Sequence, residues 1–125
     1  LPISAIPAFL DAAEQALAAD FPTARIVAFG HMGDGNLHYN LSSVDAAQNA
    51  ALIAQTEAVN RCVHDIVAGF DGAISAEHGI GQLKREEMVR YKSSVELALM
   101  RRIKDAIDPR GLMNPGKVLP DSTDF

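Results

Sequence analysis

The chain has 125 residues, 48% of them hydrophobic, and a formal net charge of −5. This length fits one small domain with a modest core. The mild negative charge argues against a nucleic-acid surface, which needs clustered Lys and Arg, and the apolar runs are much shorter than the roughly 20 residues that span a bilayer.

The first half of the chain predicts a helix followed by a β-hairpin. Ser4 can cap a helix, and apolar residues recur after it at helical spacing: Ile6, Phe9, Leu10, Ala13 and Leu17. After the break at "FPTA", the run "ARIVAF" predicts a short buried strand. The run "NLHYNLS" alternates apolar and polar residues and predicts a half-buried strand. Because glycines and Asp34 separate the two strands, we expect a hairpin with a wide turn.

The middle of the chain predicts one long helix and then a third strand. Asp45 with Gln48 resembles a capping box, and an apolar stripe follows from Leu52 to Phe70. Gly69 and Gly72 end this helix. The run "GAISA" then predicts a short strand that leads into "EHGIG".

The last third predicts two helices and a loop-like tail. "REEMVRY" favours a short helix, and Ser93 with Glu96 forms a capping box for a helix that stops at Pro109. Residues 120–125 are expected to fray. The order αββαβαα predicts an α+β fold, with helices packed on a small antiparallel sheet.

The glycine-rich turn "FGHMGDGNLHYN" brings several chemically active side chains together. In a hairpin of this kind we expect His31 and His38 to face each other across the turn, with Asn40 on the same face as His38. Two imidazoles at a rigid turn suit a divalent transition metal. Glu77, at the end of the predicted third strand, would complete an open His₂Glu site, and His78 would then face the substrate as a base.

Other interpretations of these residues stay open at this point. A glycine-rich turn is a common loop, and a single histidine beside a strand is usually a structural hydrogen-bonding group. A phosphate-binding loop is disfavoured because the glycines follow G-x-x-G-x-G and no helix comes immediately after them. The ligand types alone do not choose between zinc, manganese and iron.

Three motifs, in this order, resemble those of one protein family: "GHMGDGNLHYN", "SAEHGIGQLKREEM" and "NPGKVL". They are similar to the C-terminal domain of the FAD-linked oxidases, the flavin-dependent D-2-hydroxyacid dehydrogenases. This family includes D-2-hydroxyglutarate dehydrogenase, D-lactate dehydrogenase and the glycolate oxidase flavin subunit. The resemblance implies that His31, His38 and Glu77 hold a divalent metal, commonly zinc. It also implies that His78 is the general base and that Asn40 positions the substrate.

The resemblance extends to the cofactor and the partners. It implies that Asn114 and Lys117 lie near FAD, although a simple turn is an equal alternative for both. Residues 1–119 would form the C-terminal domain, and the FAD-binding domain would precede it in the same polypeptide. Because the chain starts with Leu1 in mid-pattern, we expect a fragment that is inactive by itself. The electron acceptor would be a quinone or an electron-transfer flavoprotein, and a homodimer is an option.

Two other functions remain as alternatives: a free-standing metal-binding module that acts with a separate flavin subunit, and a zinc hydrolase. "HYN" and "RYKSSVELALM" favour the 2-hydroxyglutarate branch of the family over the glycolate branch.

Cys62 is the single cysteine, so no intrachain disulfide can form and a reducing compartment is expected. The localisation implied is cytoplasmic or peripheral at an inner membrane, or the mitochondrial matrix in a eukaryote.

Overall fold

The computed structural model describes residues 1–120, which form two compact units. The first unit, Leu1–Ala76, contains a β-hairpin and most of the helices; the second begins at Glu77. In the first unit the elements are η1 (Ile3–Ala5), α1 (Ile6–Asp20), β1 (Arg25–Phe29), η2 (Met32–Asp34), β2 (His38–Ser42), α2 (Ala46–Ala54) and α3 (Thr56–Gly69). In the second unit they are α4 (Glu87–Tyr91) and α5 (Ser94–Ile107). The combination of helices with a small antiparallel sheet confirms the predicted α+β class.

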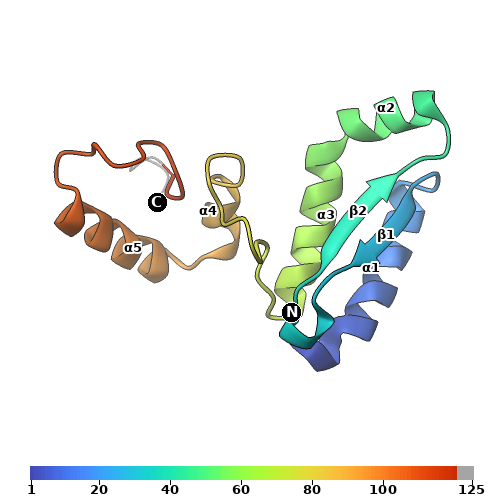
Figure 1. Cartoon of the computed structure of the whole chain (residues 1–125), viewed down its shortest axis with the longest axis horizontal. Coiled ribbons are helices and arrows are strands. Elements are labelled where there is room, and N and C mark those ends of the chain that lie inside the picture. Colours follow the sequence, from blue (N-terminus) through green and yellow to red (C-terminus); the bar gives the residue numbers. More distant parts are fainter. Residues whose placement is uncertain (121–125) are drawn as a thin grey trace. The chain divides into compact units, whose positions relative to one another are not determined.

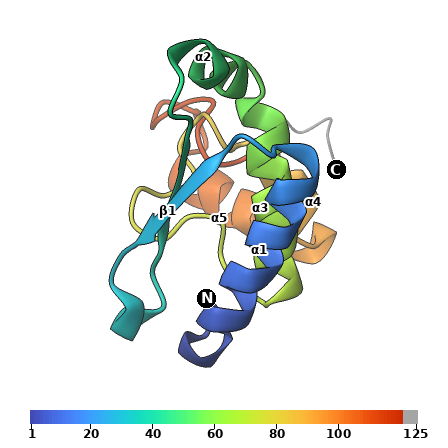
Figure 2. The same cartoon turned by 90° about the vertical axis from the view of Figure 1, so that its right-hand side faces the viewer.

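Helices α1 and α3 lie side by side and pack against one face of the hairpin (Figures 1 and 2). The core of this unit consists of Phe9, Ala13 and Val67, and Tyr39 of β2 packs against it. The ring of Phe9 meets Tyr39 edge-on at 5.7 Å between centroids. The apolar spacing thus identified the buried face of α1 correctly. The predicted cap was wrong, because the chain first forms η1 and the residue before α1 is Ala5, which has no capping side chain.

The predicted hairpin is confirmed, and the predicted third strand is wrong. Strands β1 and β2 pair antiparallel, from Arg25 opposite Ser42 to Phe29 opposite His38. Within residues 1–120 the sheet has only these two strands. Residues 72–76 turn back against α3 instead: the N–H of Gly72 donates to the carbonyl of Val67 at 2.9 Å, and Ile74 packs on the core. Ile74 thus packs on the helix core, and its segment does not pair with the sheet.

The predicted long helix is broken at Gln55 into α2 and α3. The carboxylate of Asp45 caps α2 by accepting from the N–H groups of Ala47 and Gln48, at 2.8 and 3.0 Å. No residue of α2 is buried, whereas α3 buries Val59 and Val67. Of these two helices only α3 therefore contributes to the core, and the chain changes direction between α2 and α3 (Figure 1).

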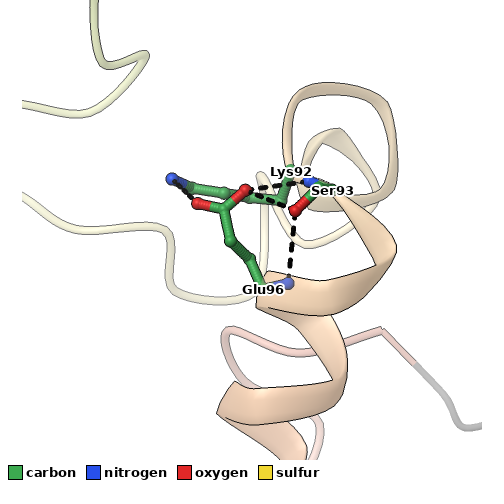
Figure 3. A network of polar contacts seen from close by, with 3 residues as sticks. All are labelled: Lys92, Ser93 and Glu96. Atoms are coloured by element: carbon green, nitrogen blue, oxygen red, sulfur yellow. Dashed lines mark hydrogen bonds and ion pairs between the residues drawn. The ribbon is translucent and has the colours of Figure 1, made fainter.

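In the second unit, α4 and α5 share a small core of Met88, Leu97 and Leu119. The predicted capping box at the start of α5 is present (Figure 3). The hydroxyl of Ser93 accepts from the N–H of Glu96 at 3.2 Å, and the Glu96 carboxylate accepts from the N–H of Ser93 at 3.0 Å. The hydrogen bond from the backbone of Ser93, together with one from the side-chain ammonium group of Lys92, lowers the pKa of Glu96 to about 2.

The segment after α5 runs back along this helix and is fixed at its end. Arg101 donates to the carbonyl of Pro120, and the N–H of Val118 donates to the carbonyl of Gly81 at 2.7 Å. Pro120 is therefore buried, and the rest of the predicted frayed tail, residues 121–125, lies outside the described residues. Among the described residues, no helix combines the length and apolarity needed to cross a membrane.

Candidate functional site

The register of the hairpin places His38 and Asn40 on the same face of the sheet. Phe29 is opposite His38, and Val27 is opposite Asn40. Because side chains alternate along a strand, these four residues share one face, while Tyr39 projects from the other face into the helix core. Val27 and Phe29 are 41% and 50% exposed. The predicted metal ligand and the predicted substrate-positioning residue of β2 therefore lie together on the face of the hairpin opposite α1 and α3.

His38 is stacked on Phe29. The two rings are nearly parallel, with an interplanar angle of 17° and 5.1 Å between their centroids. His38 is half-buried, so this contact fixes the plane of an imidazole that solvent still reaches. No role at the site was predicted for Phe29 from the sequence. The alternation of Val27 and Phe29 in "ARIVAF" was the available signal. It places both side chains on one face of β1, the face that they share with His38 and Asn40 of β2.

The turn between the strands holds the backbone of His31 in a defined position. Its carbonyl accepts from the N–H groups of Asp34 and Asn36, at 2.9 and 3.2 Å, as the chain passes through η2. Gly30 has φ +152°, and a Cβ added to it would lie 2.4 Å from the carbonyl oxygen of Asn36. The expected pairing of His31 with His38 across the turn is corrected by the register: the partner of His38 is Phe29, and His31 follows two residues later with its side chain exposed.

In the second unit, Glu77 and His78 are both exposed and belong to an irregular segment. The expectation that Glu77 ends a strand was wrong, since residues 72–76 form no strand. Among residues 1–120, no three His, Cys, Asp or Glu side chains form a group that could hold a metal ion. The ligand set His31, His38 and Glu77 therefore stays a prediction, as does the role of His78.

Asn114 and Lys117 lie in the segment after α5, close to a buried carboxylate. Asn114 has φ +47°, a left-handed conformation that asparagine tolerates well, and Lys117 donates to the side-chain oxygen of Gln82. With Ile103, Ile107 and Met113, both residues line a cavity of about 400 Å³. The two residues predicted to lie near FAD are therefore on one surface of this unit.

Asp108 orders this segment, a role that was not predicted from the sequence. Its carboxylate accepts from the ammonium group of Lys104 at 2.6 Å and from the N–H groups of Leu112 and Met113 at 2.9 and 2.8 Å. These hydrogen bonds, first that of Lys104, lower the pKa of Asp108 to about 2. The motif "DPRG" contained the signal, because an aspartate before Pro and Gly commonly accepts from the backbone a few residues ahead.

Two titratable groups of the first unit have raised pKa values. Burial, with a smaller effect of the nearby Glu14 carboxylate, raises the pKa of Tyr39 to about 12. Burial also raises the pKa of the Cys62 thiol, and Asp20 and Asp65 add to this rise. A thiol with a raised pKa is a poor nucleophile, which argues against a nucleophilic role for Cys62.

The sequence of the chain matches the family "FAD linked oxidases, C-terminal domain" over residues 1–118. The chain therefore belongs to this family. It is 45% identical over 116 residues to a D-2-hydroxyglutarate dehydrogenase of Xanthomonas citri pv. viticola, and 39% identical over 116 residues to one of Stutzerimonas stutzeri. Each match covers 93% of this chain and 25% of the relative.

A mitochondrial D-2-hydroxyglutarate dehydrogenase of Arabidopsis thaliana is 43% identical over 99 residues, which cover 79% of this chain and 17% of the relative. The chain thus spans about a quarter of the length of the bacterial relatives and less of the plant one. The family resemblance inferred from the three sequence motifs is confirmed.

Proposed function

We propose that this chain is the substrate- and metal-binding part of an FAD-dependent D-2-hydroxyacid dehydrogenase, which oxidises a 2-hydroxy acid to a 2-oxo acid. The structural observation that carries the proposal is that His38 and Asn40 share the face of the hairpin opposite α1 and α3. The names of the relatives favour D-2-hydroxyglutarate as the substrate, in agreement with the branch that the sequence favoured over glycolate.

The donor chemistry of His31, His38 and Glu77 fits a divalent metal, because two imidazoles and one carboxylate form a common open site for zinc. Solvent reaches each of these side chains, since His31 and Glu77 are exposed and His38 is half-buried. When bound, a zinc ion would act as a Lewis acid that polarises the 2-hydroxyl of the substrate. Phe29, stacked on His38, would hold the imidazole in one orientation.

The remaining residues of the proposed site act on the substrate and near the cofactor. His78 accepts the proton of the 2-hydroxyl group, and Asn40 orients the substrate through its side-chain amide. The substrate loses this proton and one hydride from its Cα, and FAD supplies the hydride acceptor. Asn114 and Lys117 would lie beside the cofactor, which the preceding part of the polypeptide binds. A quinone or an electron-transfer flavoprotein would then reoxidise the flavin.

The Arabidopsis relative is named as mitochondrial. We accordingly place the protein in the mitochondrial matrix if its source is eukaryotic, and in the cytoplasm, free or peripheral at the inner membrane, if its source is bacterial.

The proposal can be tested in a chimera in which this chain replaces the matching 116 residues of the Xanthomonas citri relative. The variant His78→Ala should lose about 10²–10⁴-fold in turnover of D-2-hydroxyglutarate, the usual value of a general base, and keep its metal. His38→Ala should lose the metal, as measured by elemental analysis. His64→Ala, on α3, is the matched control and should change neither quantity.

Three outcomes would contradict this assignment. If His78→Ala keeps turnover and loses metal, the roles of His78 and the ligands are reversed. If the 125-residue chain with added zinc cleaves esters or amides, the hydrolase alternative is favoured. If the native protein in its source cell has a mass near 13.4 kDa, a free-standing module with a separate flavin subunit is favoured.

A further inference from the structure

Val118 has a backbone conformation that its side chain disfavours. Its φ is +65°, in the left-handed region, where a residue branched at Cβ is a rare outlier. The N–H of Leu119 donates to the carbonyl of Lys117 at 2.7 Å and closes a tight turn around Val118. A γ-turn whose central residue has a positive φ is rare and strained. We refer to residues 117–119 as the strained turn.

The chain is held firmly just after Val118. Leu119 is buried in a small core with Met88 and Leu97, and Arg101 donates to the carbonyl of Pro120. Backbone strain of this kind persists only where the surrounding structure enforces it, and it often accompanies a functional site. The strained turn therefore invites the question of what it holds in place.

The strained turn contacts the glycine-rich loop that precedes α4. The N–H of Val118 donates to the carbonyl of Gly81 at 2.7 Å, and the ammonium group of Lys117 donates to the side-chain oxygen of Gln82. Ile80 packs against the small core described above. Three consecutive loop residues are thus anchored at the strained turn or at its core, although Gln82 and Lys117 are 35 residues apart in the sequence.

His78 lies at the start of this loop, where no helix or strand fixes the backbone. Residues 77–82 contain only bends, turns and irregular backbone. Gly79 and Gly81 have φ +68° and +57°, and glycine in this region adopts conformations that other residues avoid. The position of the loop therefore depends on tertiary contacts, and the anchored residues begin two positions after His78.

We infer that the strained turn positions the loop of His78, with Val118 and Gln82 as positioning residues for the oxidation of the 2-hydroxy acid. This inference rests on the proposed function for the role of His78. A base must lie within hydrogen-bond reach of the proton that it takes, and a displacement of about 1 Å can cost about 10²-fold in rate. No role was predicted from the sequence for Val118 or Gln82.

The first test compares two variants of Val118 in the chimera described above. Val118→Pro removes the N–H and cannot adopt a positive φ, so kcat for D-2-hydroxyglutarate should fall about 10- to 10²-fold. KM and metal content should stay near those of the parent, because the lost contact serves the reacting geometry and not substrate binding. Val118→Gly keeps the N–H and tolerates the φ, so it should keep the kcat of the parent.

Hydrogen exchange followed by mass spectrometry reads the anchoring without turnover. The peptide of residues 77–83 should exchange about tenfold faster in Val118→Pro, because a long-range hydrogen bond that holds it is lost. The same peptide should exchange at the parent rate in Val118→Gly.

A second pair of variants at Gln82 tests the contact even if Val118→Pro does not fold. Gln82→Met keeps the length of the side chain but removes the acceptor for Lys117, so kcat should fall about tenfold, the usual net effect of a hydrogen bond with a charged group. Gln82→Glu keeps an acceptor and should keep kcat. The matched control is Leu83→Ala, at the next residue, whose side chain is 98% exposed.

The inference is overturned if folded Gln82→Met keeps both the exchange rate of residues 77–83 and kcat, or if exchange rises while kcat stays unchanged. It is also overturned if Gln82→Glu loses as much kcat as Gln82→Met, or if Leu83→Ala does. Loss of metal in Gln82→Met would show that the contact acts on a metal ligand instead of on His78.

The two proposals can fail separately. If the parent chimera does not oxidise D-2-hydroxyglutarate but exchange of residues 77–83 rises in Gln82→Met, the proposed function is wrong and the anchoring of the loop stands. If His78→Ala loses turnover as predicted while Gln82→Met changes neither exchange nor kcat, the positioning role is wrong and the proposed function stands.

Discussion

Gly30 is a position in the hairpin turn where we expect one added methyl group to be damaging. An alanine Cβ there would lie 2.4 Å from the carbonyl oxygen of Asn36, whereas real Cβ contacts stay above 3.0 Å, so the two atoms must move apart by 3.0 − 2.4, about 0.6 Å. The φ of +152° is also one that side-chain-bearing residues rarely adopt. Strain of this kind costs about 1–3 kcal/mol.

Gly33 provides a control inside the same turn. Its backbone needs no positive φ, and a Cβ there would meet no atom within 4 Å. We expect Gly30→Ala to lower the free energy of unfolding of the 125-residue chain by about 2 kcal/mol, and Gly33→Ala to change it by less than about 0.5 kcal/mol. Urea unfolding followed by circular dichroism measures both values.

The displacement of Asn36 should also disturb the proposed metal site. Asn36 donates its N–H to the carbonyl of His31, and His38 follows it by two residues, so movement of Asn36 disturbs the backbone of both histidines. In the chimera, Gly30→Ala should therefore bind zinc at least about tenfold more weakly, as for other changes in the supporting shell of a metal site, and Gly33→Ala should not. Equal stability and equal zinc affinity in the two variants would refute this reasoning.

Three further predictions concern stability. Ser93→Ala should lower the free energy of unfolding by about 1 kcal/mol through loss of the cap of α5, with Ser94→Ala as the control in thermal unfolding; equal values would refute the capping role. Asp108 has a folded pKa of about 2, below its ordinary 3.8, so its stabilising effect is complete above pH 3.8 and is lost as the pH falls towards 2. Asp108→Asn should remove this part of the acid dependence, and an unchanged unfolding curve between these pH values would count against it. The hydroxyl of Tyr39 is buried without a hydrogen-bond partner among residues 1–120, so Tyr39→Phe should raise the free energy of unfolding by about 1 kcal/mol. Because the folded pKa of Tyr39 is about 12 against an ordinary 10, the parent should lose stability as the pH rises from 10 to 12 and the variant should lose less; a destabilised variant would contradict the argument.

The sequence predicted those elements whose pattern is local. The spacing of Phe9, Ala13 and Leu17 identified the buried face of α1, and the Ser93–Glu96 pair identified the start of α5. The alternation in β2 placed His38 and Asn40 on one face correctly, because strand periodicity does not depend on what packs against the strand.

The errors concern features that depend on tertiary partners. Residues 72–76 have the composition of a strand, but a strand needs an edge to pair with, and here Ile74 packs on the helix core instead. The break at Gln55 carries no proline or glycine that could have marked it. The stacking of Phe29 on His38 depends on the register of the hairpin, which neither strand specifies alone.

The break at Gln55 also divides a stretch of uniform helical character into two helices. Their backbone amides should differ strongly in their protection from hydrogen exchange. The backbone of α2 is held by its cap at Asp45 and by contacts of Ser43 with the side chains of Gln48 and Asn49, and none of its residues is buried. The amide protons of α2 should therefore exchange with solvent through local opening, while those near Val59 and Val67 of α3 exchange only when the first unit unfolds. Hydrogen exchange across Gln55 thus offers an internal reference for the stability of the unit that presents His38 and Asn40.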